Sequence, residues 1–252
     1  YHPAVVERRL FGVMQQMLQP NMALVFQRGC RSGPTMNLPQ VTHLPIDHGL
    51  SYPANSAVSF IAPLYLYDAQ GQRAANFLPA FIAFWEQQFG GPPEPEPVAA
   101  MLFAQSYCPA FRLKYAEALR TDFPKYSFTP ELAPRLAGPG RKLIELHLSG
   151  LSTSVQKQTA TRHIHEPNTR HAACQWKEGR YYLSPHEYLA PVSEPLSQFE
   201  IGGYPVLRKY LKGRRKETLS QTAITHLQRV VDILEETRQL MAEIDEAVGG
   251  LL

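Results

Sequence analysis

The densest group of side chains with a chemical use lies late in the chain, between residues 208 and 216. This stretch has no acidic residue, and its basic members are Arg208, Lys209, Lys212, Arg214, Arg215 and Lys216. Because lysine and arginine release counterions from a polyanion, the stretch predicts a loop that contacts phosphates. The alternative is an ordinary solvated surface, and charge alone does not choose between the two.

Two further sets of polar side chains follow expected strands and have the types that hydrogen-bond base edges. Arginine pairs well with guanine, and asparagine or glutamine pairs well with adenine. The first set is Arg28, Arg31 and Asn37, and the second is Gln156, Lys157, Arg162, His163 and Arg170. Loops are polar in most proteins, so ordinary surface is again the alternative for each residue.

A candidate metal site consists of His163, His165, His171 and Cys174. Imidazole and thiolate are zinc ligands, and two histidines at alternate positions of a strand share one face. The spacing matches no common zinc signature, however. We therefore favour a polar hairpin with incidental histidines, and we assign no metal.

The motifs of common catalytic sites are absent from the sequence. There is no G-x-x-x-x-G-K-[ST] phosphate loop, no G-x-G-x-x-G, no G-x-S-x-G and no H-E-x-x-H. There is also no N-P-P-Y or D-P-P-Y segment, which would grip a flipped base. We therefore assign no catalytic residue to this chain.

Composition indicates a folded protein of mixed structure. Of 252 residues, 44% are hydrophobic and 19% charged, which excludes disorder, and 22 prolines exclude an all-helical bundle. Cys30, Cys108 and Cys174 are widely spaced, so we expect no disulfide framework and favour the reducing cytoplasm. We find no signal peptide and no apolar run long enough to span a membrane.

The elements expected in the first 150 residues are a helix, a small sheet and a helical segment. The patterns predict a helix over 4–19, strands over 22–26 and 57–67, looser alternation over 41–50 and a turn at 68–72. A helix over 77–89 precedes a stiff break at 90–97, and helices follow over 98–119, interrupted at Pro109, and over 131–148.

The last 100 residues predict a hairpin and a long closing helix. Residues 176–182 read as two strands joined by a Glu178–Gly179 turn. A capping box at Thr218 and Gln221 should start a helix of about seven turns that ends at Gly249. This helix is acidic and directly follows the basic stretch, so the net charge of +3 hides two opposite regions.

Several segments together resemble a known family. Residues 22–28, 60–67 and 76–77 resemble the segment after the catalytic domain of large adenine-specific DNA methyltransferases, notably those of the type ISP restriction-modification group. Residues 103–115, 122–124 and 143–147 are similar to the helical part of their C-terminal specificity domain. Residues 199–204, 206–207, 211–212 and 219–220 resemble its closing motif, and residues 235–245 resemble its tail.

The resemblance spans essentially the whole chain, with one departure and one gap. Ser197 stands where the family usually has tryptophan, and the polar region 156–174 has no recognised counterpart. The resemblance implies a target-recognition region that binds double-stranded DNA. It also implies a partner, the catalytic methyltransferase domain of the same polypeptide, which the non-Met start of the chain would fit. Cofactors would belong to that parent enzyme: S-adenosylmethionine, with ATP and magnesium as further candidates.

We therefore predict an α+β fold with small mixed or antiparallel sheets, a helical segment and a long C-terminal helix. Its parts would be residues 1–90, 91–150 and 151–252, integrated into one recognition domain. The predicted function is DNA target recognition, with loops reading bases and the basic stretch holding phosphates. We expect the acidic helix to serve as scaffold, because phosphate would repel it. The rival hypothesis is a helical protein-interaction or oligomerisation module without DNA contact.

Overall fold

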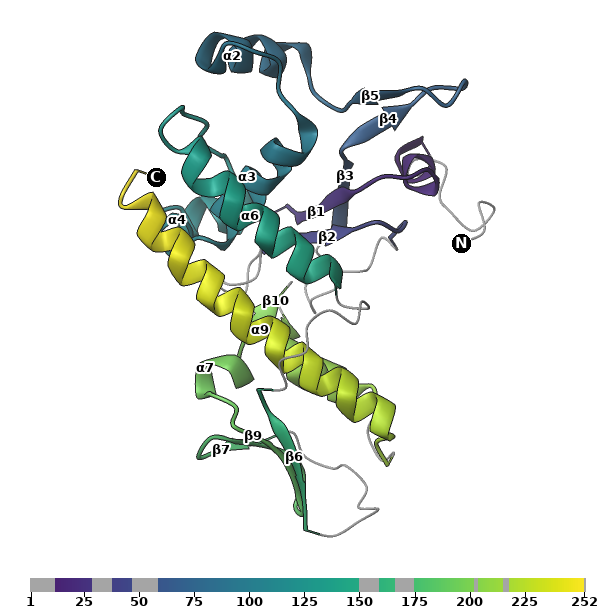
Figure 1. Ribbon diagram of the computed structural model, residues 1–252, viewed down its shortest axis with the longest axis vertical. Helices are drawn as coiled ribbons and strands as arrows, with labels where there is room; N and C mark the ends of the chain where they lie inside the picture. Colours follow the sequence, from purple (N-terminus) through teal and green to yellow (C-terminus); the bar gives the residue numbers. More distant parts are fainter. Residues whose placement is uncertain are drawn as a thin grey trace.

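The computed structural model describes residues 12–28, 38–46, 59–149, 159–165, 175–201, 204–214 and 218–251. The molecule is elongated, and one long helix runs along most of its length (Figure 1). Helices and two small sheets gather at one end, and a four-stranded sheet forms the other end (Figure 1). This is the α+β fold with small antiparallel sheets that the sequence predicts, so the fold class is confirmed.

The first sheet contains three antiparallel strands in the order β2-β1-β3. They are β1 (Ala23–Gln27), β2 (Gln40–Thr42) and β3 (Ser59–Pro63), preceded by the short 3-10 helix η2 (Gln15–Leu18). The strand predicted at 22–26 is confirmed, and it is buried because it is a run of small and branched apolar residues. Of the helix predicted at 4–19, the structure describes only the part from residue 12.

The prediction of a single strand over 57–67 is wrong, because Leu64 interrupts the extended backbone and separates two strands. Residues on its two sides form β3 and β4 (Tyr65–Tyr67), and β4 turns back to pair with β5 (Arg73–Ala75). The predicted turn at 68–72 is confirmed. The Asp68 carboxylate accepts from the backbone N–H groups of Gln70 and Gln72, which holds the turn closed.

The helical segment has five helices in the described part of the chain. They are α2 (Pro79–Phe89), α3 (Pro95–Tyr107), α4 (Pro109–Lys114), α5 (Ala116–Thr121) and α6 (Ala133–Leu148). The first three begin with proline at the first helical position, where its missing N–H costs nothing. The stiff break predicted over 90–97 is therefore too long, because Pro95 opens α3.

The last 100 residues contain a four-stranded antiparallel sheet in the order β6-β9-β8-β7. Its strands are β6 (Thr161–Ile164), β7 (Gln175–Lys177), β8 (Arg180–Ser184) and β9 (Glu187–Ala190). The predicted hairpin is confirmed as β7–β8, and Glu178 and Gly179 both have positive φ, as a two-residue hairpin turn requires. Three short elements follow: α7 (Glu194–Ser197), the β10–β11 pair (Glu200–Ile201 and Tyr204–Pro205) and α8 (Val206–Lys212).

The closing helix α9 (Gln221–Val248) belongs to both hydrophobic cores of the molecule. Its C-terminal half packs against α3 and α6, around Phe103, Tyr107 and Leu143. Its N-terminal half packs against the four-stranded sheet and α8, around Leu183 and Leu189. We call the two ends the helical lobe (η2 to α6 with the C-terminal half of α9) and the sheet lobe (β6 to α8 with its N-terminal half).

The packing of α9 into both cores agrees with the expected scaffold, and its separation from DNA stays a prediction. Its predicted capping box is wrong. The N-cap is Ser220, whose hydroxyl accepts from the Ala223 N–H at 3.2 Å, and not Thr218. The helix ends at Gly249, as predicted, and this residue adopts the left-handed conformation. No helix in the described ranges is long and apolar enough to cross a membrane. The division at residues 90 and 150 stays a prediction.

Candidate nucleic-acid interface

The outer face of the four-stranded sheet carries a row of polar and aromatic side chains. Pairing places Gln175, Tyr182, Tyr188 and His163 directly opposite one another on β7, β8, β9 and β6. Their neighbours along the strands, Tyr181 and Leu189 among them, point into the core of the sheet lobe. Since side chains alternate along a strand, this row must face away from α9.

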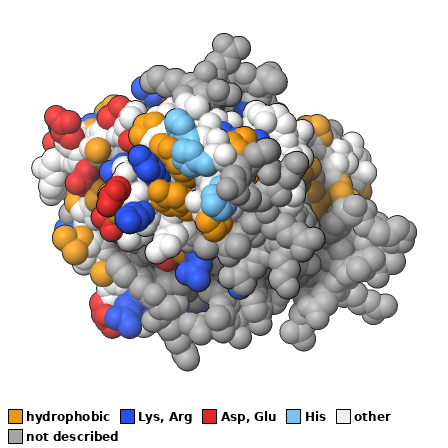
Figure 2. Space-filling view, turned by 90° about the horizontal axis from the view of Figure 1, so that it is seen from below, with side chains coloured by type: hydrophobic (Ala, Val, Ile, Leu, Met, Phe, Trp, Pro, Cys, Tyr) orange, Lys and Arg blue, Asp and Glu red, His pale blue; other side chains and the backbone are white. Residues whose placement is uncertain are grey.

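Tyr188 is the centre of an aromatic cluster on this face. The rings of His163 and Tyr188 stack with their centroids 4.8 Å apart, and His165 and Tyr182 lie 5.7 and 5.4 Å from the same ring. The Arg180 guanidinium lies 5.0 Å from the Tyr188 ring centroid. Figure 2, viewed onto this end of the molecule, shows histidine, Lys or Arg and hydrophobic side chains gathered together.

Arg180 is a fixed positive charge on this face. A hydrogen bond to Tyr182, with the nearby Tyr188 and Glu178, raises the pKa of its guanidinium above the ordinary value. Lys177 is directly opposite Arg180 on β7, so two cations flank the hairpin turn. The Tyr188 ring itself is buried, with 8% of its surface exposed. The accessible flat rings, which stack on bases, are therefore the exposed His163 and the half-buried Tyr182, and the exposed Arg180 and Lys177 supply cations, which attract phosphates.

Arg162, predicted to read bases, makes an ion pair and a further hydrogen bond within the protein. Its Nε donates to Glu187 at 2.7 Å, and its Nη1 donates to Gln221 at 3.2 Å. Glu187 is buried, so its charge requires this partner. The side chain ties β6 to β9 and to the start of α9. Base reading by Arg162 stays a prediction. If Arg162 bound a base, it would have to give up its contacts with Glu187 and Gln221.

The basic stretch was predicted as a loop over residues 208–216, and this is wrong over residues 208–212, which belong to the helix α8. Arg208, Lys209 and Lys212 are exposed on α8, which forms because Leu207 and Leu211 anchor one face of it in the core. Arg214 just beyond is held against Tyr210, with its guanidinium 4.0 Å from the ring centroid and its Nη1 bonded to the Tyr210 carbonyl. Arg215 and Lys216 lie outside the described residues.

Arg28 is not brought to this face. It belongs to the helical lobe, where its Nε lies 3.1 Å from Asp122. The Phe123 N–H and the Arg28 guanidinium lower the pKa of Asp122 below its ordinary value. Both side chains are more than half exposed, so the ion pair leaves Arg28 accessible. The remaining predicted residues, namely Arg31, Asn37, Gln156, Lys157 and Arg170, lie outside the described ranges.

The candidate metal site is only partly visible. His163 and His165 share the outer face, as alternate positions on β6 predict, and both contact Tyr188. His171 and Cys174 lie outside the described residues. Within the described ranges, no three metal-ligating side chains come together.

The sequence interpretation missed five residues of this face. They are Gln175, Lys177, Arg180, Tyr182 and Tyr188. The hairpin itself was predicted, and its alternation puts Gln175 and Lys177 on one face with Arg180 and Tyr182. That pattern was a usable signal, although β9 could not be paired with β8 and β6 from sequence.

Comparison with known proteins gives a family and a fold. The family model described as "Type ISP C-terminal specificity domain" matches residues 1–243. Comparison with curated protein sequences finds no match.

Solved structures of low sequence identity share the fold over most of the chain. The DNA-bound "ATP-dependent Type ISP restriction-modification enzyme LlaBIII" has a TM-score of 0.67 and 13% identity, covering 90% of this chain and 16% of that one. The DrdV–DNA complex has a TM-score of 0.65 and 20% identity over 91% of this chain and 24% of that one. A nuclease-deletion mutant of the Type ISP enzyme LlaGI in complex with a DNA substrate mimic has a TM-score of 0.63 and 14% identity, over 89% of this chain and 21% of that one. The chain thus spans a quarter or less of these proteins.

Proposed function

Because the chain belongs to the family of Type ISP C-terminal specificity domains, we propose that it is the DNA-reading part of a restriction-modification enzyme. The observation that carries this proposal is the outer face of the sheet lobe. It offers the exposed Arg180 guanidinium and the exposed His163 ring, which stacks on the buried Tyr188, on an antiparallel sheet. The three structural neighbours were all solved with DNA or a DNA mimic, which supports the same partner.

In this proposal the β7–β8 ribbon enters the major groove, which is wide enough for two strands. Arg180 and Lys177, beside the turn, would approach base edges or phosphates first. The exposed Lys209 and Lys212 of α8 would contact the phosphate backbone and hold the domain in register. The acidic helix α9 stays behind the sheet, away from the phosphates.

Catalysis would belong to another part of a longer polypeptide. We propose an adenine-specific methyltransferase domain as that partner, with S-adenosylmethionine as its cofactor and the target adenine flipped into its site. ATP and magnesium would serve further parts, as the ATP-dependent neighbour suggests. This function implies a cytoplasmic protein.

One observation favours protein interaction as an additional role. The helix α2 exposes Phe84 at 40%, and Leu78 just before it is 76% exposed. Its other face is occupied, because Phe81 and Trp85 pack against Phe128. Exposed apolar side chains close together on one element favour a protein contact. In the proposal it docks the catalytic part, so the two roles are compatible.

A salt titration of duplex binding tests the DNA-reading function. We expect the affinity of the chain for a DNA duplex to fall steeply as salt rises, because phosphate contacts release counterions. Replacing both Lys209 and Lys212 with alanine should weaken binding to all sequences alike and flatten the slope of log K against log salt by about 2.

The matched control is Lys142→Ala on α6, an exposed lysine in the helical lobe. It should leave both affinity and slope unchanged. Absence of duplex binding at low salt would refute the proposal, and leave the interaction module as the better explanation. Equal effects of the α8 and Lys142 variants would refute the assigned surface.

A further inference from the structure

A polar pocket of about 620 Å³ lies between the edge strand β7, the helix α7, the β10–β11 pair and the start of α8. Its lining includes Gln175, Trp176, Glu194, Glu200 and Arg208. Gln175 also ends the row on the outer face of the sheet, and Arg208 is the first exposed cation of α8. The pocket therefore connects the two regions of the proposed DNA-binding surface.

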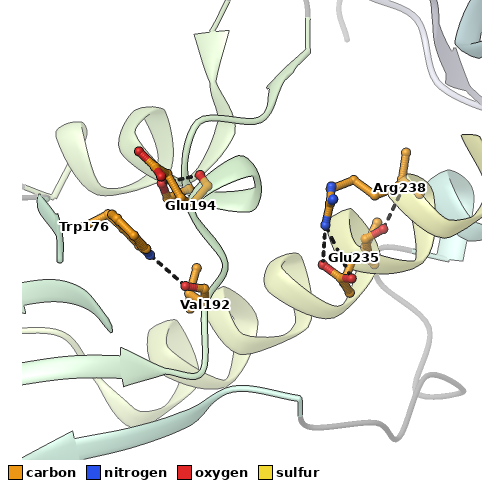
Figure 3. Close-up of polar contacts among 8 residues, drawn as sticks. Trp176, Val192, Glu194, Glu235 and Arg238 are labelled. Atoms are coloured by element: carbon orange, nitrogen blue, oxygen red, sulfur yellow. Dashed lines mark hydrogen bonds and ion pairs between the residues drawn. The ribbon is translucent and has the colours of Figure 1, made fainter. Parts of the chain in front are cut away.

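One wall of the pocket is a fixed aromatic ring. The Trp176 indole donates its Nε1–H to the Val192 carbonyl at 2.7 Å, which anchors the ring beside α7 (Figure 3). Because the only polar atom of the indole is satisfied there, the part of the ring that lines the pocket is purely apolar. A flat apolar wall of this kind suits the face or edge of a planar base.

The polar part of the lining contains both hydrogen-bond acceptors and a guanidinium, which is a hydrogen-bond donor. Glu194 and Glu200 contribute carboxylates, and Arg208 contributes a guanidinium. The Glu194 Oε1 accepts from the Gln198 amide at 3.4 Å, and a carboxylate with about four acceptor positions retains capacity for further donors. The Glu194 carboxylate, beside phosphate-contacting cations, would weaken DNA binding unless it accepts hydrogen bonds from the DNA itself.

Base edges provide such donors. The major-groove edge of cytosine presents the N4 amino group, which aspartate and glutamate accept from, and guanine presents O6 and N7, which arginine donates to. A C·G pair therefore offers partners for both charges of the pocket at once.

We propose that this pocket reads one C·G base pair of the target, with Glu194 or Glu200 accepting from cytosine N4 and Arg208 donating to guanine. The inference rests on the proposed DNA-reading function and makes it specific. Arg208 thereby differs from Lys209 and Lys212, which contact phosphates. Its loss should change sequence preference as well as affinity.

The test is selection of bound duplexes from a randomised library by the full chain and by four variants. Glu194→Gln, Glu200→Gln and Arg208→Ala alter the pocket. Glu235→Gln is the matched control, because Glu235 pairs with Arg238 on α9 at 3.1 Å and is not part of the pocket lining (Figure 3). Glutamine keeps the shape of glutamate, so the three glutamine variants should fold. Arg208 is exposed on α8, so its replacement by alanine should leave the core intact.

We expect the unmodified chain to select C·G at one position, and the preference there to fall by about tenfold or more in Arg208→Ala and in at least one of the two pocket glutamine variants. All other positions, and the Glu235 variant, should keep the original preferences. Unchanged preferences in all three pocket variants, or relaxation at different positions, would overturn the pocket assignment alone. Failure of the unmodified chain to select any sequence would overturn the proposed function with it.

Discussion

At Gly140 the backbone of α6 approaches α3 so closely that a side chain has no room. A Cβ atom built there would lie 1.9 Å from the carbonyl oxygen of Ala100. Glycine normally weakens a helix interior, so its presence here requires a packing reason. The contact between α3 and α6 is the centre of the helical lobe, and it depends on this glycine.

We predict that Gly140→Ala lowers the free energy of unfolding by about 3 kcal/mol, because backbone atoms cannot move aside as a flexible side chain would. The matched control is Gly138→Ala in the same helix, where nothing apart from its chain neighbours lies within 4 Å of the added Cβ. That change should alter stability by no more than about 1 kcal/mol, because the gain in helix propensity is opposed by the contact of the new Cβ with the following Pro139. Chemical denaturation of both variants measures the difference, and similar stabilities would contradict the close approach.

Residue types could be predicted from the sequence better than residue partners. His163 was a predicted contact and lies on the outer face, because strand alternation is a local property. Arg28 and Arg162 were predicted on the same basis, yet each pairs with a distant acid, Asp122 or Glu187. Such partners are 94 and 25 residues away, and periodicity carries no information about them.

At the scale of elements, the start of α9 shows how two plausible caps compete. Thr218 and Ser220 are both hydroxyl residues, and the box pattern with Gln221 favoured the first. The structure uses Ser220, with Gln221 as the first helical residue. The identity of α9 and its end at Gly249 were predictable from its apolar stripe, whereas the choice between neighbouring caps depends on backbone dihedrals.

Ser220→Ala should therefore destabilise the protein by about 1 kcal/mol, because the Ala223 N–H loses its acceptor at the end of a helix that both lobes use. Thr218→Ala, at an exposed position outside the helix, should change stability by no more than about 0.5 kcal/mol. Thermal melts of the two variants give the comparison. If Thr218→Ala were the more destabilising change, the result would support the predicted capping box and contradict Ser220 as the N-cap.

At the scale of the whole molecule, the single helix α9 contributes side chains to both hydrophobic cores. Ile224 and Leu227 are buried in the sheet lobe, and Leu240 and Ile244 are buried in the helical lobe. Between these pairs lies Glu236, which is exposed. Continuity of the helix at this point should make the lobes unfold together.

Glu236→Pro should uncouple them, because proline removes a helical hydrogen bond and clashes with the preceding turn, at a cost of about 3 kcal/mol. The chain has two tryptophans, Trp85 in the core of the helical lobe and Trp176 packed on that of the sheet lobe, so single-tryptophan variants report each lobe separately. We expect coincident fluorescence transitions for the parent chain and for Glu236→Ala, and separate transitions for Glu236→Pro. Coincident transitions in the proline variant would argue against coupling through α9.

The shared helix also determines how such a domain can be recombined. Residues 159–214 do not make a complete core alone, since Ile224, Leu227, Val231 and Leu234 of α9 complete it. A graft that exchanged only the sheet and its loops between relatives would bring together two cores that never packed against each other. A graft that crosses over near the middle of α9 would carry the whole sheet lobe as a cassette. At about 1.5 Å per residue, the 28 residues of the helix would hold that cassette at an unchanged distance from the helical lobe.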